Sequence, residues 1–164
     1  MTQHTEMIKE ADGRFGGGSI IDATKENDRQ FLCNLLVHSS DLSNPVLPKF
    51  SVVDKWARLV CAEFTEEAES AKALNVGVQG FMDDVRNDWH IASLQVSFIS
   101  FVVAPLWGAL ASILPSAQLF VDCLQHNKQE WQEKVRRCAI NAAKAAAADA
   151  VRSATDAEEA AMNL

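Results

Sequence analysis

The chain has 164 residues, of which 48% are hydrophobic, so it can form one modest domain with a core and is not a disordered protein. Its formal net charge of -7 argues against unaided binding to nucleic acid or to an anionic membrane, because both need a basic patch and the Lys and Arg residues are scattered. The first ten residues lack the apolar core of a signal peptide, and the four separated cysteines indicate buried, reduced thiols, so we expect an intracellular, cytoplasmic protein.

Two helices are predicted before Pro45. Residues 1–10 are expected to form the last turns of a helix that ends in the glycine-rich residues 11–18. Polar residues at 22–27 supply N-cap side chains for the second helix, in which apolar residues recur at intervals of three and four. This helix should end by Asn44, because proline disfavours helical geometry in the residue before it.

The third predicted helix runs from about Ser51 to Lys72 and is amphipathic. Its charged residues lie mostly away from one apolar stripe, which consists of Val53, Trp56, Val60 and Phe64. Core packing is the default interpretation of this stripe, and the wall of a pocket is the alternative. Residues 75–88 then mix Gly, Asp and Asn with two apolar residues, a composition typical of a loop.

A long apolar stretch, from Ile91 to Val121, contains no charged residue. It is long enough to span a bilayer, so it is either a membrane segment or the buried central helix of a soluble domain. Asn87 or Asp88 is expected to cap it, and Pro105 should kink it.

Pro115 is expected to end the apolar stretch and to begin a shorter helix that runs to His126. The last segment, residues 139–164, is rich in alanine and has few large apolar residues, which predicts a solvated helix or a frayed tail. No convincing strand appears, so the predicted class is all-α.

Two small groups of residues contain side chains that could bind a metal ion or a ligand. His38, Asp41 and Asn44 recur every three residues at a helix end, but a lone imidazole–carboxylate pair supplies at most two metal ligands. Taken alone, this pattern favours a capping Asp and a surface His over a metal site. Gln95 lies one turn before Phe98 on an apolar helix, and its amide is costly there unless it is paired. It either joins a neighbouring helix or contacts a ligand such as a purine edge, with Phe98 covering the face of the base.

Five groups of residues form an ordered pattern along the chain: His38-Ser-Ser-Asp41-Leu-Ser-Asn44-Pro45; Trp56 with Glu63-Phe64; Phe81-Met82-Asp83; Gln95-Val-Ser-Phe98 through Pro105-Leu-Trp107; and Asn127 with Trp131. In order and spacing the pattern resembles the C-terminal portion of the catalytic domain of class I cyclic nucleotide phosphodiesterases. The resemblance implies an all-α helical bundle, the C-terminal subdomain of the HD-type catalytic fold, over residues 1–135. Residues 136–164 are then an Ala-rich helical or frayed tail.

The resemblance also implies roles for six residues. Asp41 matches the family's last metal-ligating aspartate, Gln95 the glutamine that hydrogen-bonds the purine edge, and Phe98 the aromatic ring that stacks on the base. The other residues implied to line the base pocket are Asn44, Val60 and Phe64. Metal-dependent hydrolysis of the 3′ phosphoester bond of cyclic AMP or cyclic GMP is the implied activity.

The family's His-Asn-x-x-His motif and adjacent His-Asp pair are missing, so this chain contains no catalytic general acid and one of the protein ligands for two divalent metal ions, expected to be zinc and magnesium. We therefore expect a fragment that needs the N-terminal half of the catalytic domain as a partner and is inactive alone. Cyclic nucleotide is the expected ligand, nucleic acid and a membrane span are not expected, and a homodimer is left open. Two alternatives are an inactive nucleotide-binding or regulatory module and a single-pass membrane protein using Leu94 to Leu114.

Overall fold

The computed structural model describes residues 2–15, 21–82, 85 and 87–162. Within those ranges the chain forms helices and turns and no strand, which confirms the all-α class. The helices are α1 (Thr2–Phe15), α2 (Glu26–Asp41), α3 (Phe50–Ala73), α4 (Asp88–Phe98), α5 (Ala104–Ile113) and α6 (Gln118–Met162). Short helical turns join them: η1 (Asn44–Val46), η2 (Gly80–Met82), the π-helical η3 (Ile99–Val103) and η4 (Pro115–Ala117).

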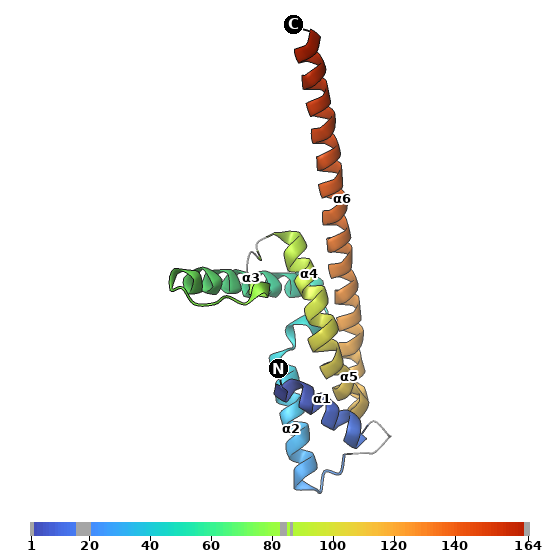
Figure 1. The fold of residues 1–164 in the computed structure, drawn as a ribbon. Helices are drawn as coiled ribbons and strands as arrows, with labels where there is room; N and C mark the ends of the chain where they lie inside the picture. Colours follow the sequence, from blue (N-terminus) through green and yellow to red (C-terminus); the bar gives the residue numbers. More distant parts are fainter. Residues whose placement is uncertain (1, 16–20, 83–84, 86, 163–164) are drawn as a thin grey trace.

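The apolar stretch forms the centre of the fold. In Figure 1, α4, η3 and α5 run along the first part of α6, α1 and α2 lie at the α5 end, and α3 projects to one side. The stretch contributes buried side chains all along its length: Ile91, Ala92, Ile99, Val103, Leu106, Trp107 and Leu110. The segment Asp88–Ile113 is long and apolar enough to cross a membrane on length and composition, and 33% of its most apolar window is buried inside this fold, where α4 and α5 pack on α1, α2 and α6.

Pro105 disturbs the central helix through the residues before it. A proline nitrogen cannot donate the usual helical hydrogen bond, and the five residues from Ile99 to Val103 form a π-helical turn immediately before α5. Pro105 is therefore accompanied by a change from α-helical to π-helical hydrogen bonding in the residues before it, and the predicted kink stays a prediction. Asn87 caps α4 as expected, since its side chain accepts a hydrogen bond from the His90 amide.

Three local expectations differ from the structure. α1 continues through residues 11–13 and ends at Phe15, and the expectation for the glycine run at 16–18 lies outside the described residues. α2 begins after Lys25, whose side chain has no acceptor and makes no cap, and Asp22 accepts hydrogen bonds from the amide and hydroxyl of Thr24 before the helix starts. Cys33 is exposed rather than buried, whereas Cys61 is buried.

The helix predicted to end at His126 continues instead to Met162 as a single 45-residue helix. Alanine has the highest helix propensity, so the Ala-rich segment extends α6 without needing a core. Every residue from Ala139 to Ser153 is exposed, and this part of α6 extends away from the other helices in Figure 1. The proposed division between residues 135 and 136 falls within this helix and stays a prediction.

Candidate functional site

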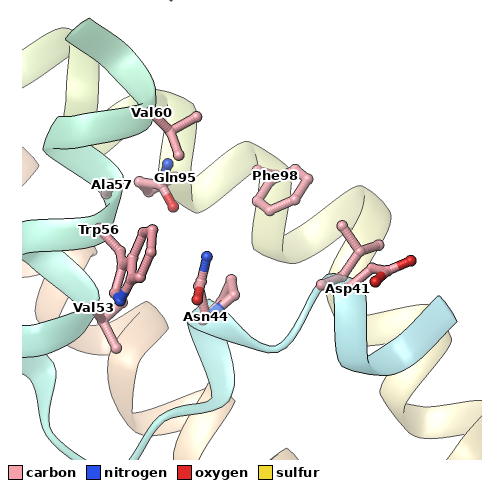
Figure 2. A pocket seen from close by; sticks show the side chains of 10 residues that line it. Asp41, Asn44, Val53, Trp56, Ala57, Val60, Gln95 and Phe98 are labelled. Atoms are coloured by element: carbon pink, nitrogen blue, oxygen red, sulfur yellow. The ribbon is translucent and has the colours of Figure 1, made fainter. Parts of the chain in front are cut away.

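A cavity of about 210 Å³ lies between the α2–α3 connection, α3 and α4. We call it the Gln95 cavity, and its lining residues are Asp41, Leu42, Asn44, Pro45, Val53, Trp56, Ala57, Val60, Gln95 and Phe98. In Figure 2, Trp56, Val60 and Gln95 lie close together on the left, and Phe98 and Asp41 lie on the right. Three segments, residues 41–45, 53–60 and 95–98, therefore meet at one concave site.

Five of the six residues singled out from the sequence line this cavity: Asp41, Asn44, Val60, Gln95 and Phe98. The sixth, Phe64, lies one turn beyond Val60 on α3, and its ring packs edge-to-face on Phe81 with the ring centroids 5.7 Å apart. Phe64 thus packs the middle of α3 against the η2 turn and does not line the cavity. The part that each residue plays toward a ligand remains a prediction.

Two side-chain amides and the Asp41 carboxylate are polar groups that line the cavity. Gln95 and Asn44 are each partly buried, and within the described part of the chain neither amide is hydrogen-bonded to protein. Gln95 is therefore not used to join α4 to a neighbouring helix, which was one of the two interpretations of a glutamine in this apolar helix. Each amide therefore has its NH₂ donors and its carbonyl acceptor available to a planar polar ligand.

The face of α3 that packs in the core differs from the apolar stripe predicted from the sequence. The buried residues of α3 are Val53, Ala57, Cys61, Thr65 and Ala68, so the core side is built mostly from small side chains. Trp56 is 46% exposed and lines the cavity. The predicted stripe correctly placed Val53 in the core, while Trp56 belongs to the pocket wall that was the alternative interpretation.

Asp41 is the last residue of α2 and is exposed at the edge of the cavity. The same carboxylate also borders a shallow depression on α2 together with His38 and Cys33. Among the described residues, no group of three or more His, Cys, Asp or Glu side chains is placed to hold a metal ion. The chemistry of this donor set therefore does not fit a complete metal centre.

His38 is paired with His4, an arrangement that sequence spacing could not reveal. His4 Nδ1 on α1 lies 2.8 Å from His38 Nε2 on α2, and the two ring centroids are 5.1 Å apart in an edge-to-face contact. One ring must donate and the other accept, so the contact requires at least one neutral imidazole. Burial, and then the neighbouring His38, lower the pKa of His4.

Comparison with known proteins identifies the group to which this fold belongs. The family model for 3′,5′-cyclic nucleotide phosphodiesterases matches residues 1–124. A probable 3′,5′-cyclic phosphodiesterase of Caenorhabditis elegans is 31% identical over 143 residues, covering 82% of this chain and 20% of the relative. The 3′,5′-cyclic-AMP phosphodiesterase 4C of Mus musculus is 30% identical over 113 residues, covering 66% of this chain and 16% of the relative.

A solved structure shows the same arrangement of helices. The phosphodiesterase domain of the RhoPDE fusion protein from the choanoflagellate Salpingoeca rosetta superimposes with a TM-score of 0.79 at 25% identity, covering 84% of this chain and 43% of that domain. The chain thus spans less than half of the solved domain and a fifth or less of the two curated relatives. Because the family model covers 124 of the 164 residues, the chain belongs to the 3′,5′-cyclic nucleotide phosphodiesterase family.

Proposed function

We propose that this chain supplies the purine-binding pocket and one metal-binding aspartate of a catalytic site that hydrolyses the 3′ phosphoester bond of cyclic AMP or cyclic GMP. The carrying observation is that the two unpaired amides, Gln95 and Asn44, line the same cavity as the Phe98 ring. A purine offers a polar edge and two apolar faces, and this combination provides for both. The family membership supports the substrate class.

The size of the cavity favours the base over the whole nucleotide. Its volume of about 210 Å³ is below the roughly 300–1,000 Å³ typical of sites that enclose a drug-sized ligand. A purine between Phe98 and Val60 would leave its sugar and phosphate outside the cavity. Asp41, exposed at the cavity edge, is the carboxylate available to a metal ion near that phosphate.

We propose that the other metal ligands and the general acid come from polypeptide outside this chain. The family implies two divalent cations, which we expect to be zinc and magnesium. Bound together they would supply a water molecule of lowered pKa and charge stabilisation. Asp41 alone cannot assemble such a centre, so this chain's own part is to bind and orient the base. The partner would be the N-terminal half of the catalytic domain, in the cytoplasm, with a homodimer left open.

A hydrolysis assay tests whether this chain alone can cleave cyclic nucleotide. The purified 164-residue chain, supplied with Mg²⁺ or Mn²⁺ and with cyclic AMP or cyclic GMP, should give no turnover above the metal alone. Asp41→Ala should behave identically. Clear turnover that Asp41→Ala abolishes would show that the chain is a complete catalyst and would overturn this proposal.

An inactive nucleotide-binding module is the second candidate. One observation favours it: the residues proposed to bind the base line one cavity, whereas the described residues contain no group of side chains that could hold a metal ion. It shares the prediction that the chain binds cyclic nucleotide without added metal. It differs in predicting that adding the N-terminal half of a family catalytic domain restores no hydrolysis.

A further inference from the structure

Asn127 on α6 is fully buried and holds the turn that carries Asn44. Its side-chain nitrogen Nδ2 donates to the carbonyl oxygens of Pro45 and Leu47, both at 2.8 Å. These carbonyls belong to the η1 turn and the residue after it, between α2 and α3. A single side chain from the far end of the sequence thus fixes the backbone on which one wall of the Gln95 cavity is built.

The chemistry of the contact requires an amide. Two carbonyl oxygens can only accept, and a side chain that donates to both at once needs two N–H groups on one small planar atom set, which asparagine supplies. Reversing the amide would aim Oδ1 at both carbonyls, so the orientation is unambiguous. Leucine at this position has a similar size and cannot donate, and it would leave the Pro45 carbonyl buried without a partner.

Two neighbours on the same face of α6 set the register of this contact. Trp131, one turn after Asn127, is fully buried and packs edge-to-face on Phe50 at 5.0 Å between ring centroids. Lys134 lies 2.8 Å from the Asp54 carboxylate. Residues 127, 131 and 134 share one helical stripe, and they contact residues 45–54 in matching order along the chain.

We propose that Asn127 is a positioning residue for nucleotide binding. It keeps the η1 turn in the geometry that points Asn44 and Pro45 into the Gln95 cavity. This inference rests on the proposed purine site, because its consequence is an effect on nucleotide affinity. A role limited to general stability would affect melting temperature and leave the turn and the affinity unchanged at a temperature where the chain is folded.

The test compares Asn127→Leu with Leu124→Val in the 164-residue chain. Leu124 is fully buried on the same helix, so its truncation disturbs the core without removing a hydrogen bond to the turn. Hydrogen exchange is measured at the Val46 and Leu47 amides, which donate within η1 to Ser43 and Asn44. Cyclic AMP affinity is measured by calorimetry on the same samples.

Asn127→Leu should raise exchange at both amides about tenfold and weaken cyclic AMP binding about tenfold, and Leu124→Val should do neither. Unchanged exchange in Asn127→Leu would overturn the inference, as would faster exchange with unchanged affinity. If the unaltered chain binds no cyclic AMP, the proposed function fails on its own, and the exchange result still decides whether Asn127 holds the turn.

Asn127→Asp provides a second test in case the Asn127→Leu variant does not fold. Its protonated carboxyl group can donate one O–H to one of the two carbonyls, and its ionised form can donate none. Exchange at Val46, relative to the unaltered chain, should therefore increase as the pH is raised. A ratio that does not change with pH would contradict the role assigned to the donor.

Discussion

The Lys134 ammonium group of α6 lies 2.8 Å from the Asp54 carboxylate of α3. The same carboxylate accepts from Arg58 one turn later, and Arg58 in turn contacts Asp88 at the start of α4. Three helices are therefore joined by charged groups near the start of α3, where Trp56 lies between Asp54 and Arg58 in the sequence. The Lys134 contact is the most shielded of these pairs, with its side chains 20% and 23% exposed.

Asp54→Asn should lower the free energy of unfolding by about 1 kcal/mol, the upper part of the range for partly exposed ion pairs. The matched control is Arg136→Gln, which removes an exposed pair with Glu133 on α6 and should cost about 0.3 kcal/mol. Urea denaturation followed by circular dichroism measures both. Equal losses in the two variants would show that the Asp54 pair does not anchor α3.

His4 should make stability depend on pH. Its pKa is held below the ordinary value of 6.5, chiefly by burial and further by His38. The unfolded chain therefore binds this proton more readily, so stability is greatest above about pH 6.5 and falls as the pH drops through that value toward the lower folded-state pKa. Melting temperatures from about pH 5 to pH 8 should show this slope.

His4→Gln should flatten that slope. His126→Gln serves as the control because His126 is exposed on α6, and its slope should match that of the unaltered chain. An unchanged slope in His4→Gln would mean that the His4–His38 contact does not couple folding to protonation.

The exposed part of α6 should contribute little to folding. A chain that ends at Ala143 keeps two helical turns beyond Val135, so that Trp131 and Lys134 stay clear of a fraying helix end. Its unfolding midpoint in urea should match that of the full chain, whereas Trp131→Ala should cost about 3–5 kcal/mol. A large loss on truncation would reveal a contact made by the distal helix, for example with a second copy.

Asp88–Ile113 should behave as a core segment in solution. Its buried side chains, among them Ile99, Val103 and Leu106, belong to the hydrophobic core, and part of the segment, such as Phe101, stays exposed. In a flotation assay with neutral vesicles, the folded chain should stay in the unbound fraction. Quantitative recovery with the vesicles would favour the membrane alternative.

The elements that sequence reasoning placed well are those with strong local signals. Asn87 at a helix start, Pro45 and Pro115 at helix ends, and the amphipathic segment of α3 each act through neighbouring residues. The sequence did not predict which face of α3 packs in the core. Ala57 and Cys61 lie on that face, and their side chains are smaller and less apolar than that of Trp56, which dominates the predicted stripe. The length of α6 was missed because a helix with little core of its own gives no hydrophobic period to follow.

The same distinction applies to the site. Five residues of the cavity could be predicted because the order and spacing of sequence motifs matched a family pattern. They are Asp41, Asn44, Val60, Gln95 and Phe98, and all five line the Gln95 cavity. The Asn127 contact could not be predicted, since a side chain bonding to the backbone of a turn 80 and 82 residues away leaves no periodic signal. The His4–His38 pair was missed for the same reason.

Binding of cyclic AMP to the 164-residue chain, measured by isothermal titration calorimetry without added metal, tests the purine pocket most directly. Gln95→Leu removes the amide at nearly constant size, and Ser97→Ala alters the same helix outside the cavity lining. We expect saturable binding that Gln95→Leu weakens about tenfold or more and Ser97→Ala leaves unchanged. No binding by the folded chain, or equal affinity in all three proteins, would contradict the assignment of the Gln95 cavity to the base.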